Sequence, residues 1–220
     1  MSVNYVYIMG RRKYARPITT ESEYRNIRNS ARNINNLRKA RLGDDAAKRR
    51  LVQMNYSGYY PRGVVAGSKY PSKAFGFDID DRDAFEIVAK KLLSAPEKYG
   101  LLMLERSVSQ GGHAIFKREI GRTILENQVR IACELECEMD CKAHDINRVY
   151  FTTGNDDLLY ISQELFNDTC DEEASQKEYV ELTEREVNGE EELPDGAHSN
   201  IKHFKPWQNN RREHPNFNAR

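Results

Sequence analysis

The stretch Phe75-Gly76-Phe77-Asp78-Ile79-Asp80-Asp81 decides how the rest of the chain is interpreted. In a β-strand, successive side chains point to opposite faces of the sheet. The apolar residues at 75, 77 and 79 therefore fall on one face and anchor the segment in a core. Asp78 and Asp80 fall on the other face, and Gly76 leaves space beside them. The stretch predicts a central strand that carries two carboxylates, about 7 Å apart, on its polar face.

Two neighbouring carboxylates repel each other. Burial of either one costs on the order of several kcal/mol, as for other buried charges, unless a cation compensates. Hard divalent ions such as Mg²⁺ and Mn²⁺ prefer carboxylate oxygens. The pair therefore predicts a metal site. The alternative is a solvated strand end that runs into an acidic turn, and the stretch alone leaves both open.

The composition is that of a soluble protein with some disorder. Hydrophobic residues make up 39% of the 220, charged residues 31%, and the mean hydropathy is −0.80. No apolar run approaches the roughly 20 residues of a membrane span, and residues 1–12 lack the pattern of a signal peptide. We therefore expect a cytoplasmic protein with no membrane partner.

Opposite charges gather in different parts of the chain. Residues 10–50 hold thirteen Lys or Arg against four acidic residues, a net charge of about +9, and residues 171–192 hold ten acidic residues against two basic ones, about −8. The basic segment suits a polyanion such as nucleic acid. The arginines of its first predicted helix are Arg25, Arg28, Arg32, Arg38 and Arg41. We expect them to form a solvated face, and the alternative is that they contact nucleic-acid phosphates.

The hydrophobic periodicity predicts an α+β protein. Helices are expected from a cap at Thr19 or Thr20 through Leu37 to an end at Gly43, from a cap at Asp44 or Asp45 through Met54, from Asp81 and Asp83 to near Pro96, and over 122–141. Strands are expected over 3–9, 75–80, 101–104, 113–117, 146–153 and 158–161, with a basic connector over 11–16 and a turn, strand and turn over 56–72.

The turn 107–112 is rich in small residues and leads into a strand that begins at His113. Small residues let backbone amides approach a phosphate, and His113 or Lys117 on the following strand can meet its charge. The alternative is an ordinary hairpin turn.

Cysteines at 133, 137 and 141 repeat every four residues and would share one stripe of a helix. Cys133 and Cys141 would then lie about 12 Å apart along the axis, too far to bind one zinc ion together. Two of the cysteines with His144 or Cys170 could still bind zinc, and the alternative is that all are small buried hydrophobes.

After Phe166 the globular pattern fades. The sequence therefore predicts one folded domain over 1–167. It predicts an acidic linker and a polar, basic tail over 168–220, disordered except for a short helix.

Three motifs follow one another in order: the strand with Asp78 and Asp80, a Ser-x-Gly-Gly-His strand entry over 109–113, and Asp145 followed by Asx-Arg and an apolar strand. This order resembles the archaeo-eukaryotic primase superfamily, the primase-polymerases. The chain looks most like the VirE N-terminal domain type of bacterial mobile elements, and the likeness covers roughly 45–161.

The resemblance implies a primase-type catalytic core, in which a split α/β unit and a mostly antiparallel sheet resembling an RNA-recognition module enclose the active site. Asp78, Asp80 and Asp145 match the carboxylates that bind two Mg²⁺ or Mn²⁺ ions. His113 matches the histidine that contacts the phosphates of the incoming nucleotide, with Ser109 beside it. Arg148 matches an arginine that acts at the phosphates or holds the site together.

The implied function is primer synthesis or polymerisation on single-stranded DNA during mobile-element replication, from nucleoside triphosphates. The sequence has no P-loop motif, so a helicase would act in trans, and it has no zinc motif of the kind that some primases carry. The basic segment 10–50 would bind the template.

Two other functions use the same residues. A metal-dependent phosphatase or nuclease would need the same carboxylates, although the Asp81-Arg82-Asp83 that follows Asp80 is not the turn of a haloacid-dehalogenase-type phosphatase. A catalytically inactive nucleic-acid-binding protein of a mobile element would retain them without using them. Whether Asp78, Asp80 and Asp145 converge on one cleft is the feature that separates these readings.

Overall fold

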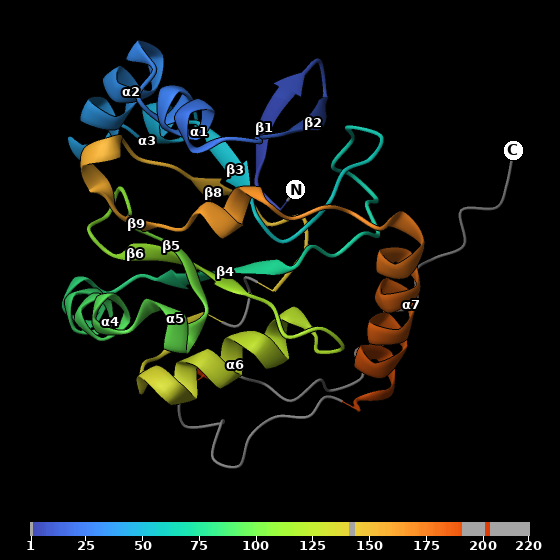
Figure 1. Cartoon of the computed structure of the whole chain (residues 1–220). Helices are drawn as coiled ribbons and strands as arrows, with labels where there is room; N and C mark the ends of the chain where they lie inside the picture. Colours follow the sequence, from blue (N-terminus) through green and yellow to red (C-terminus); the bar gives the residue numbers. More distant parts are fainter. Residues whose placement is uncertain (1, 141–143, 191–200, 203–220) are drawn as a thin grey trace, which may run out of the picture.

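A computed structural model describes residues 2–140, 144–190 and 201–202 (Figure 1). Within these ranges the protein is a mixed α+β fold with two antiparallel four-stranded sheets and seven α-helices. No helix in them is both long and apolar enough to cross a membrane. The expectation of an α+β protein is confirmed.

The first sheet has the strand order β2-β1-β3-β8. Its strands are β1 (Asn4–Met9), β2 (Arg12–Pro17), β3 (Gln53–Asn55) and β8 (Tyr150–Phe151). Residues 11–16, for which the sequence predicts a connector, belong instead to a hairpin with β1. Gly10, at a φ of 63°, supplies the backbone conformation that the two-residue turn needs. Pairing with β1 overrides the charged, weakly strand-forming composition of this segment.

The second sheet has the order β4-β6-β5-β9 and contains the stretch with which the sequence analysis began. Its strands are β4 (Ala74–Ile79), β5 (Leu101–Arg106), β6 (Gly112–Lys117) and β9 (Leu158–Ile161), so all four predicted strands are confirmed. One face packs on helices α4 (Arg82–Ser94), α5 (Pro96–Tyr99) and α6 (Ile124–Leu135), and the other packs on the first sheet. Figure 1 shows these layers one above the other.

The basic segment forms three helices rather than two. Helix α1 (Glu21–Arg28) begins at one of the two predicted caps, where Thr20 accepts a hydrogen bond from the amide of Glu23. The helix ends at Arg28, and a separate helix, α2 (Ala31–Arg41), follows. Helix α3 (Asp45–Lys48) begins at the predicted cap Asp44. It does not continue through Met54, because that fully buried side chain lies in β3 and packs between the sheets.

Several predicted boundaries are wrong. Helix α6 ends at Leu135, well before 141, because Glu136 adopts a φ of 54° and Lys91 binds both the Leu135 carbonyl and the Glu136 carboxylate. The apolar run at 64–66 contributes only an isolated bridge from Val64 to Tyr14. The predicted strand over 146–153 is confined to β8, and 3₁₀ helices η1 (Asn155–Asp157) and η2 (Gln163–Phe166) flank β9. Short strands β7 (Met139–Asp140) and β10 (Ile201–Lys202) pair in parallel.

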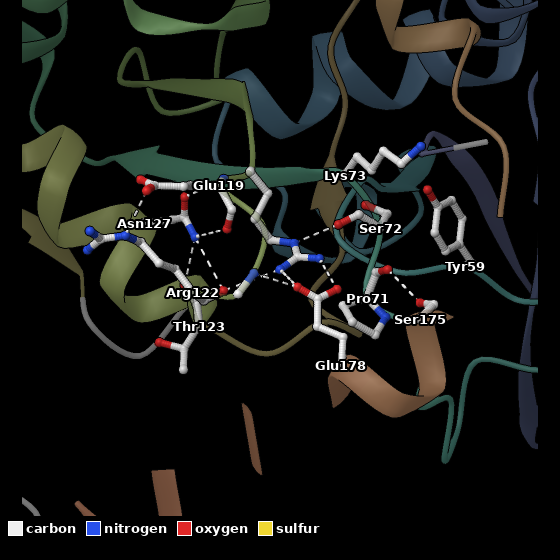
Figure 2. Close-up of polar contacts among 12 residues, drawn as sticks. Tyr59, Pro71, Ser72, Lys73, Glu119, Arg122, Thr123, Asn127, Ser175 and Glu178 are labelled. Atoms are coloured by element: carbon white, nitrogen blue, oxygen red, sulfur yellow. Dashed lines mark hydrogen bonds and ion pairs between the residues drawn. The ribbon is translucent and has the colours of Figure 1, made fainter. Parts of the chain in front are cut away.

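Helix α7 (Glu172–Asn188) occupies a region where the sequence predicts mostly linker. Polar contacts hold it to the body: the Ser175 hydroxyl donates to the Pro71 carbonyl at 2.8 Å, and Glu178 accepts two hydrogen bonds from Arg118 at 2.7 and 2.8 Å (Figure 2). The tail over 191–200 and 203–220, like Cys141, lies outside the described residues. The boundary between domain and tail stays a prediction.

We expect Glu178→Ala to loosen α7 selectively. The Arg118 side chain is only 1% exposed, so this pair is largely sheltered from water, and hydrogen bonds to charged groups contribute about 1.5–3 kcal/mol. Amides of α7 should therefore exchange with deuterium about tenfold faster or more, while those of β4 keep their rates. Glu181→Ala is the matched control, since Glu181 is 61% exposed and its one ion-pair partner among the described residues is Lys177.

The same contact should weaken in acid. Burial would raise the pKa of Glu178, but Arg118 and the amide of Gly121 outweigh it and lower the pKa below its usual value of 4.5. The stabilisation is therefore present above about pH 4.5 and is lost as the pH falls through the lowered pKa. An α7 exchange rate in Glu178→Ala equal to that of wild type would contradict this account.

Candidate functional site

A cavity of about 540 Å³ lies where the two sheets meet, and all six residues singled out from the sequence line it. They come from three separate parts of the chain: the end of β4, the turn and strand 107–113, and the segment 145–151. The full set of site residues predicted from the sequence is Asp78, Asp80, Ser109, His113, Asp145 and Arg148. Their common location is a property of the fold, whereas the role of each residue stays a prediction.

The end of β4 carries the first two carboxylates. Its apolar side chains pack against the helices, so Asp78 points toward the first sheet with its side chain 20% exposed, and Asp80 lies just beyond the strand and is exposed. The expectation that Gly76 leaves empty space beside them is wrong. A Cβ at this position would lie 2.2 Å from the hydroxyl oxygen of Tyr150, so the glycine admits that ring between the sheets.

His113 stands in the middle of a row of three titratable residues. On the second sheet its register partners are Asp78 on β4 and Glu105 on β5. Its Nδ1 lies 2.8 Å from Oε1 of Glu105, and its Nε2 lies 3.8 Å from Oδ1 of Asp78. The Tyr150 ring meets the imidazole edge to face, with centroids 5.2 Å apart. These contacts fix the imidazole and direct Nε2 toward the carboxylate at the cavity.

Glu105 holds the imidazole in this orientation through Nδ1, the ring nitrogen that does not face Asp78. Burial alone would raise its pKa, but the charge of Arg28 and the contacts with His113 lower the pKa to about 2. Glu105 is therefore ionised at neutral pH and can only accept hydrogen bonds, so Nδ1 of His113 is the donor. Burial would lower the pKa of His113, but Glu105 and Asp78 outweigh it and raise the pKa, which favours the cationic form.

Arg28 completes a buried chain of charges and corrects the expectation that it lies on a solvated face. Both Arg28 and Glu105 are 0% exposed, and Nη1 of the guanidinium donates to Oε2 of the carboxylate. Its other partners include the hydroxyl of Thr152 and, at 2.9 Å, the carbonyl of Gly154. The pair joins α1, in the middle of the basic segment, to β5 and to the segment after β8.

The sequence offered little signal for this pair. Glu105 is a charged residue that follows an apolar run in a strand, a pattern that is equally typical of a strand reaching solvent. Arg28 sits among other arginines with nothing to distinguish it. Only the contact between two segments 77 residues apart identifies either residue.

Close packing requires glycine at two positions where the turn between β5 and β6 meets β6. A Cβ on Gly111 would lie 2.1 Å from the Ile79 carbonyl oxygen, and one on Gly112 would lie 1.8 Å from the Phe85 ring. Each glycine thus lets the turn pack closely against β4 and α4. Ser107 and Ser109, by contrast, line the cavity.

The segment after Asp145 brings the third carboxylate and an arginine to the cavity. Oδ1 of Asp145 accepts a hydrogen bond from the amide of Asn147 at 2.8 Å. The Asn55 side chain donates to the carbonyls of Ile146 and Arg148 at 2.8 and 2.7 Å, which ties the segment to β3. Asp145 and Arg148 are both exposed.

Three cations of the cavity lack an ion-pair partner among the described residues: Lys13 on β2, Lys48 on α3 and Arg148. The two lysines come from the basic segment that the sequence analysis assigned to nucleic acid, although neither was singled out there. Lys117, which was expected to help bind phosphate, lies about 13 Å farther along β6 than His113 and pairs with Glu164. It does not line the cavity.

The carboxylates suit a hard divalent cation by donor type, because Mg²⁺ and Mn²⁺ select oxygen ligands. The carboxylates, however, do not lie close enough together to form a complete set of metal ligands. Among residues 2–140, 144–190 and 201–202, no three His, Cys, Asp or Glu side chains are grouped closely enough to hold a metal ion. The described residues also include no such group around Cys133, Cys137 and Cys170, so nothing in them supports the zinc alternative.

Comparison of the chain with protein-family models, with curated proteins and with solved structures finds no match. The functional argument therefore rests on the chemistry of the cavity.

We expect the buried pair to behave as a unit in stability measurements. Removal of one partner of a buried ion pair leaves an uncompensated charge and costs about 3–5 kcal/mol. Arg28→Met and Glu105→Leu should each lower the free energy of unfolding by about that amount, measured by urea denaturation. The double variant should be more stable than either single variant, and losses that simply add would contradict the pairing.

The pH dependence gives an independent check. Since the pKa of Glu105 is lowered from its usual 4.5 to about 2, the stabilisation from its ionised form is present above about pH 4.5 and is lost as the pH falls toward 2. Wild type should therefore lose stability more steeply across this range than the double variant does. Equal slopes would show that Glu105 does not have a lowered pKa.

Proposed function

We propose that this protein is a metal-dependent nucleotidyl transferase of the primase-polymerase type, which extends nucleic acid on a single-stranded DNA template during mobile-element replication. The observation that carries the proposal is the division of charge within one cavity. Carboxylates at 78, 80 and 145 line it together with Lys13, Lys48 and Arg148, which have no ion-pair partner among the described residues. Nucleotidyl transfer needs both groups, anionic for metal and cationic for phosphate.

In this reaction the 3′-oxygen of a growing strand forms a bond to the α-phosphorus of a nucleoside triphosphate while the bond to pyrophosphate breaks. His113 would donate from Nε2 to a phosphate oxygen, held by Glu105 in the orientation that this requires. Arg148 would bind the same triphosphate, and Ser109 also lines the cavity. Such preorganised donors stabilise the charge that develops during phosphoryl transfer.

Asp78, Asp80 and Asp145 would hold Mg²⁺ or Mn²⁺, which when bound promotes attack by the 3′-hydroxyl and neutralises the leaving pyrophosphate. The location of the cavity supports the assignment. Side chains from both sheets line it, and the primase resemblance implies an active site between an α/β unit and a sheet of the RNA-recognition type. A helicase acting in trans stays part of this proposal.

The second candidate is a nucleic-acid-binding protein without catalytic activity. The observation that favours it is the open arrangement of the carboxylates, since no three metal-binding side chains are grouped among the described residues. Hydrolysis of a phosphate ester, as in a nuclease or phosphatase, would use the same carboxylates and is separated from transfer by its products.

The decisive experiment measures incorporation of labelled ribo- and deoxynucleotides on a primed and an unprimed single-stranded DNA template with Mn²⁺ or Mg²⁺. Wild type should extend the strand, and Asp80→Ala should lose at least about 100-fold of this activity, the scale of removing a group on which the transition state depends. Because Asp80 is exposed, the substitution should leave the thermal midpoint within a few degrees of wild type.

Asp156→Ala is the matched control, because it removes an exposed carboxylate that does not line the cavity. Equal incorporation by wild type and Asp80→Ala would remove the site assignment. Strand cleavage in place of extension would favour a nuclease. Tight binding of the template with no reaction under either metal would favour the inactive binding protein.

A further inference from the structure

The β1–β2 hairpin reaches away from the rest of the fold. Figure 1 shows it extending upward from the first sheet, beyond the loop that follows β3. Near its base it is anchored, since Val6 and Ala15 are buried against Tyr60 and Val65. Toward its tip the packing ends, and every residue from Tyr7 to Lys13 is exposed.

The exposed tip combines large apolar side chains with positive charge. Tyr7 is 37% exposed, Ile8 61% and Met9 60%. Arg11, Arg12 and Lys13 follow directly, and none of them pairs with an acidic residue of the described chain. There is no Asp or Glu between Asn4 and Thr20. Such a surface is costly to leave in water and is complementary to an anionic partner with apolar parts.

The aromatic residues of the hairpin are arranged in a row. The Tyr5 and Tyr7 rings, and the Tyr7 and Tyr14 rings, have centroids 5.8 Å apart and planes inclined by 22°. Arg12 stands on the same face, opposite Met9 in the strand register, and Arg16 stands opposite Tyr5 and pairs with Glu23. Near-parallel aromatic rings interspersed with arginines offer stacking surfaces to bases and charge to phosphates.

Lys13 connects this hairpin to the cavity. It lies opposite Ile8 in the register, on the hairpin face away from the tyrosines, and it lines the cavity with Asp78 and Asp80. An anionic chain that leaves the cavity on the side of Lys13 therefore reaches the hairpin.

We propose that the β1–β2 hairpin binds a single nucleic-acid strand that leaves the cavity past Lys13 and crosses the hairpin tip, with Arg11 and Arg12 at its phosphates and Tyr7 and Tyr14 against its bases. The inference rests on the proposed function for the identity of the strand as a template. The charge complementarity and the row of rings favour a single strand over a duplex, whose bases are already stacked and out of reach of the tyrosines.

The test measures binding of a fluorescein-labelled oligodeoxythymidine by anisotropy over a series of salt concentrations, without nucleotide or divalent metal. Tyr7→Ala/Tyr14→Ala should weaken binding about 5- to 150-fold for each base that loses its stacking ring. Arg11→Ser/Arg12→Ser should reduce the slope of log affinity against log salt by about 1.4, for two lost phosphate contacts.

The matched control is Arg32→Ser/Arg38→Ser, which removes the same charge from exposed positions of α2. It should change the affinity less than about threefold. Circular dichroism establishes that each variant remains folded.

The outcomes separate this inference from the proposed function. Hairpin variants that lose binding while wild type shows no incorporation would leave the hairpin site standing and overturn the enzymatic proposal. Equal effects of the α2 and hairpin substitutions would show a diffuse charge effect and overturn the hairpin site. Wild-type binding to anionic phosphatidylserine vesicles but not to the oligonucleotide would also overturn it.

Discussion

The ion pair between Arg28 and Glu105 is the interaction on which the candidate site depends. Both side chains are fully buried between the sheets, where a lone charge would cost several kcal/mol, on the order known for unpaired buried ions. In other proteins, replacement of such a pair by apolar residues can leave stability unchanged or increase it. The contribution of the pair here is therefore the orientation that it gives to neighbouring side chains. With Glu105 ionised and fixed by Arg28, His113 has one orientation available, and its Nε2 faces Asp78.

Close packing sets the distance between the sheets at the same place. Gly76 admits the Tyr150 ring, and that ring contacts the imidazole of His113 edge to face. Gly111 and Gly112 bring the following turn against β4 and α4. The cavity therefore has a rigid wall formed by the second sheet and a more exposed wall formed by Asp145, Arg148 and the lysines.

The sequence predicted those parts of the fold that depend on local pattern. The alternation over 75–80 identified β4, and the helix caps at Thr20 and Asp44 were correct because a cap needs only its own turn. The six candidate residues were found through the order of three motifs, and they line one cavity. Local pattern could not reveal the burial of Arg28, whose partners lie 77 and more residues away. Local pattern also could not reveal the length of α7. Polar contacts, such as those of Glu178 and Ser175, hold this helix in place, and it has no apolar stripe that would do so.

The partners of Arg28 also determine when the site can assemble during synthesis. The guanidinium needs the carboxylate at 105 and the hydroxyl and carbonyl groups at 152 and 154, which lie 124 and 126 residues later in the chain. The carboxylate pair on β4 and the imidazole on β6 are thus translated well before the last of these groups leaves the ribosome. A nascent chain that ends before residue 154 therefore holds Asp78 and His113 without the complete set of partners that surrounds Arg28.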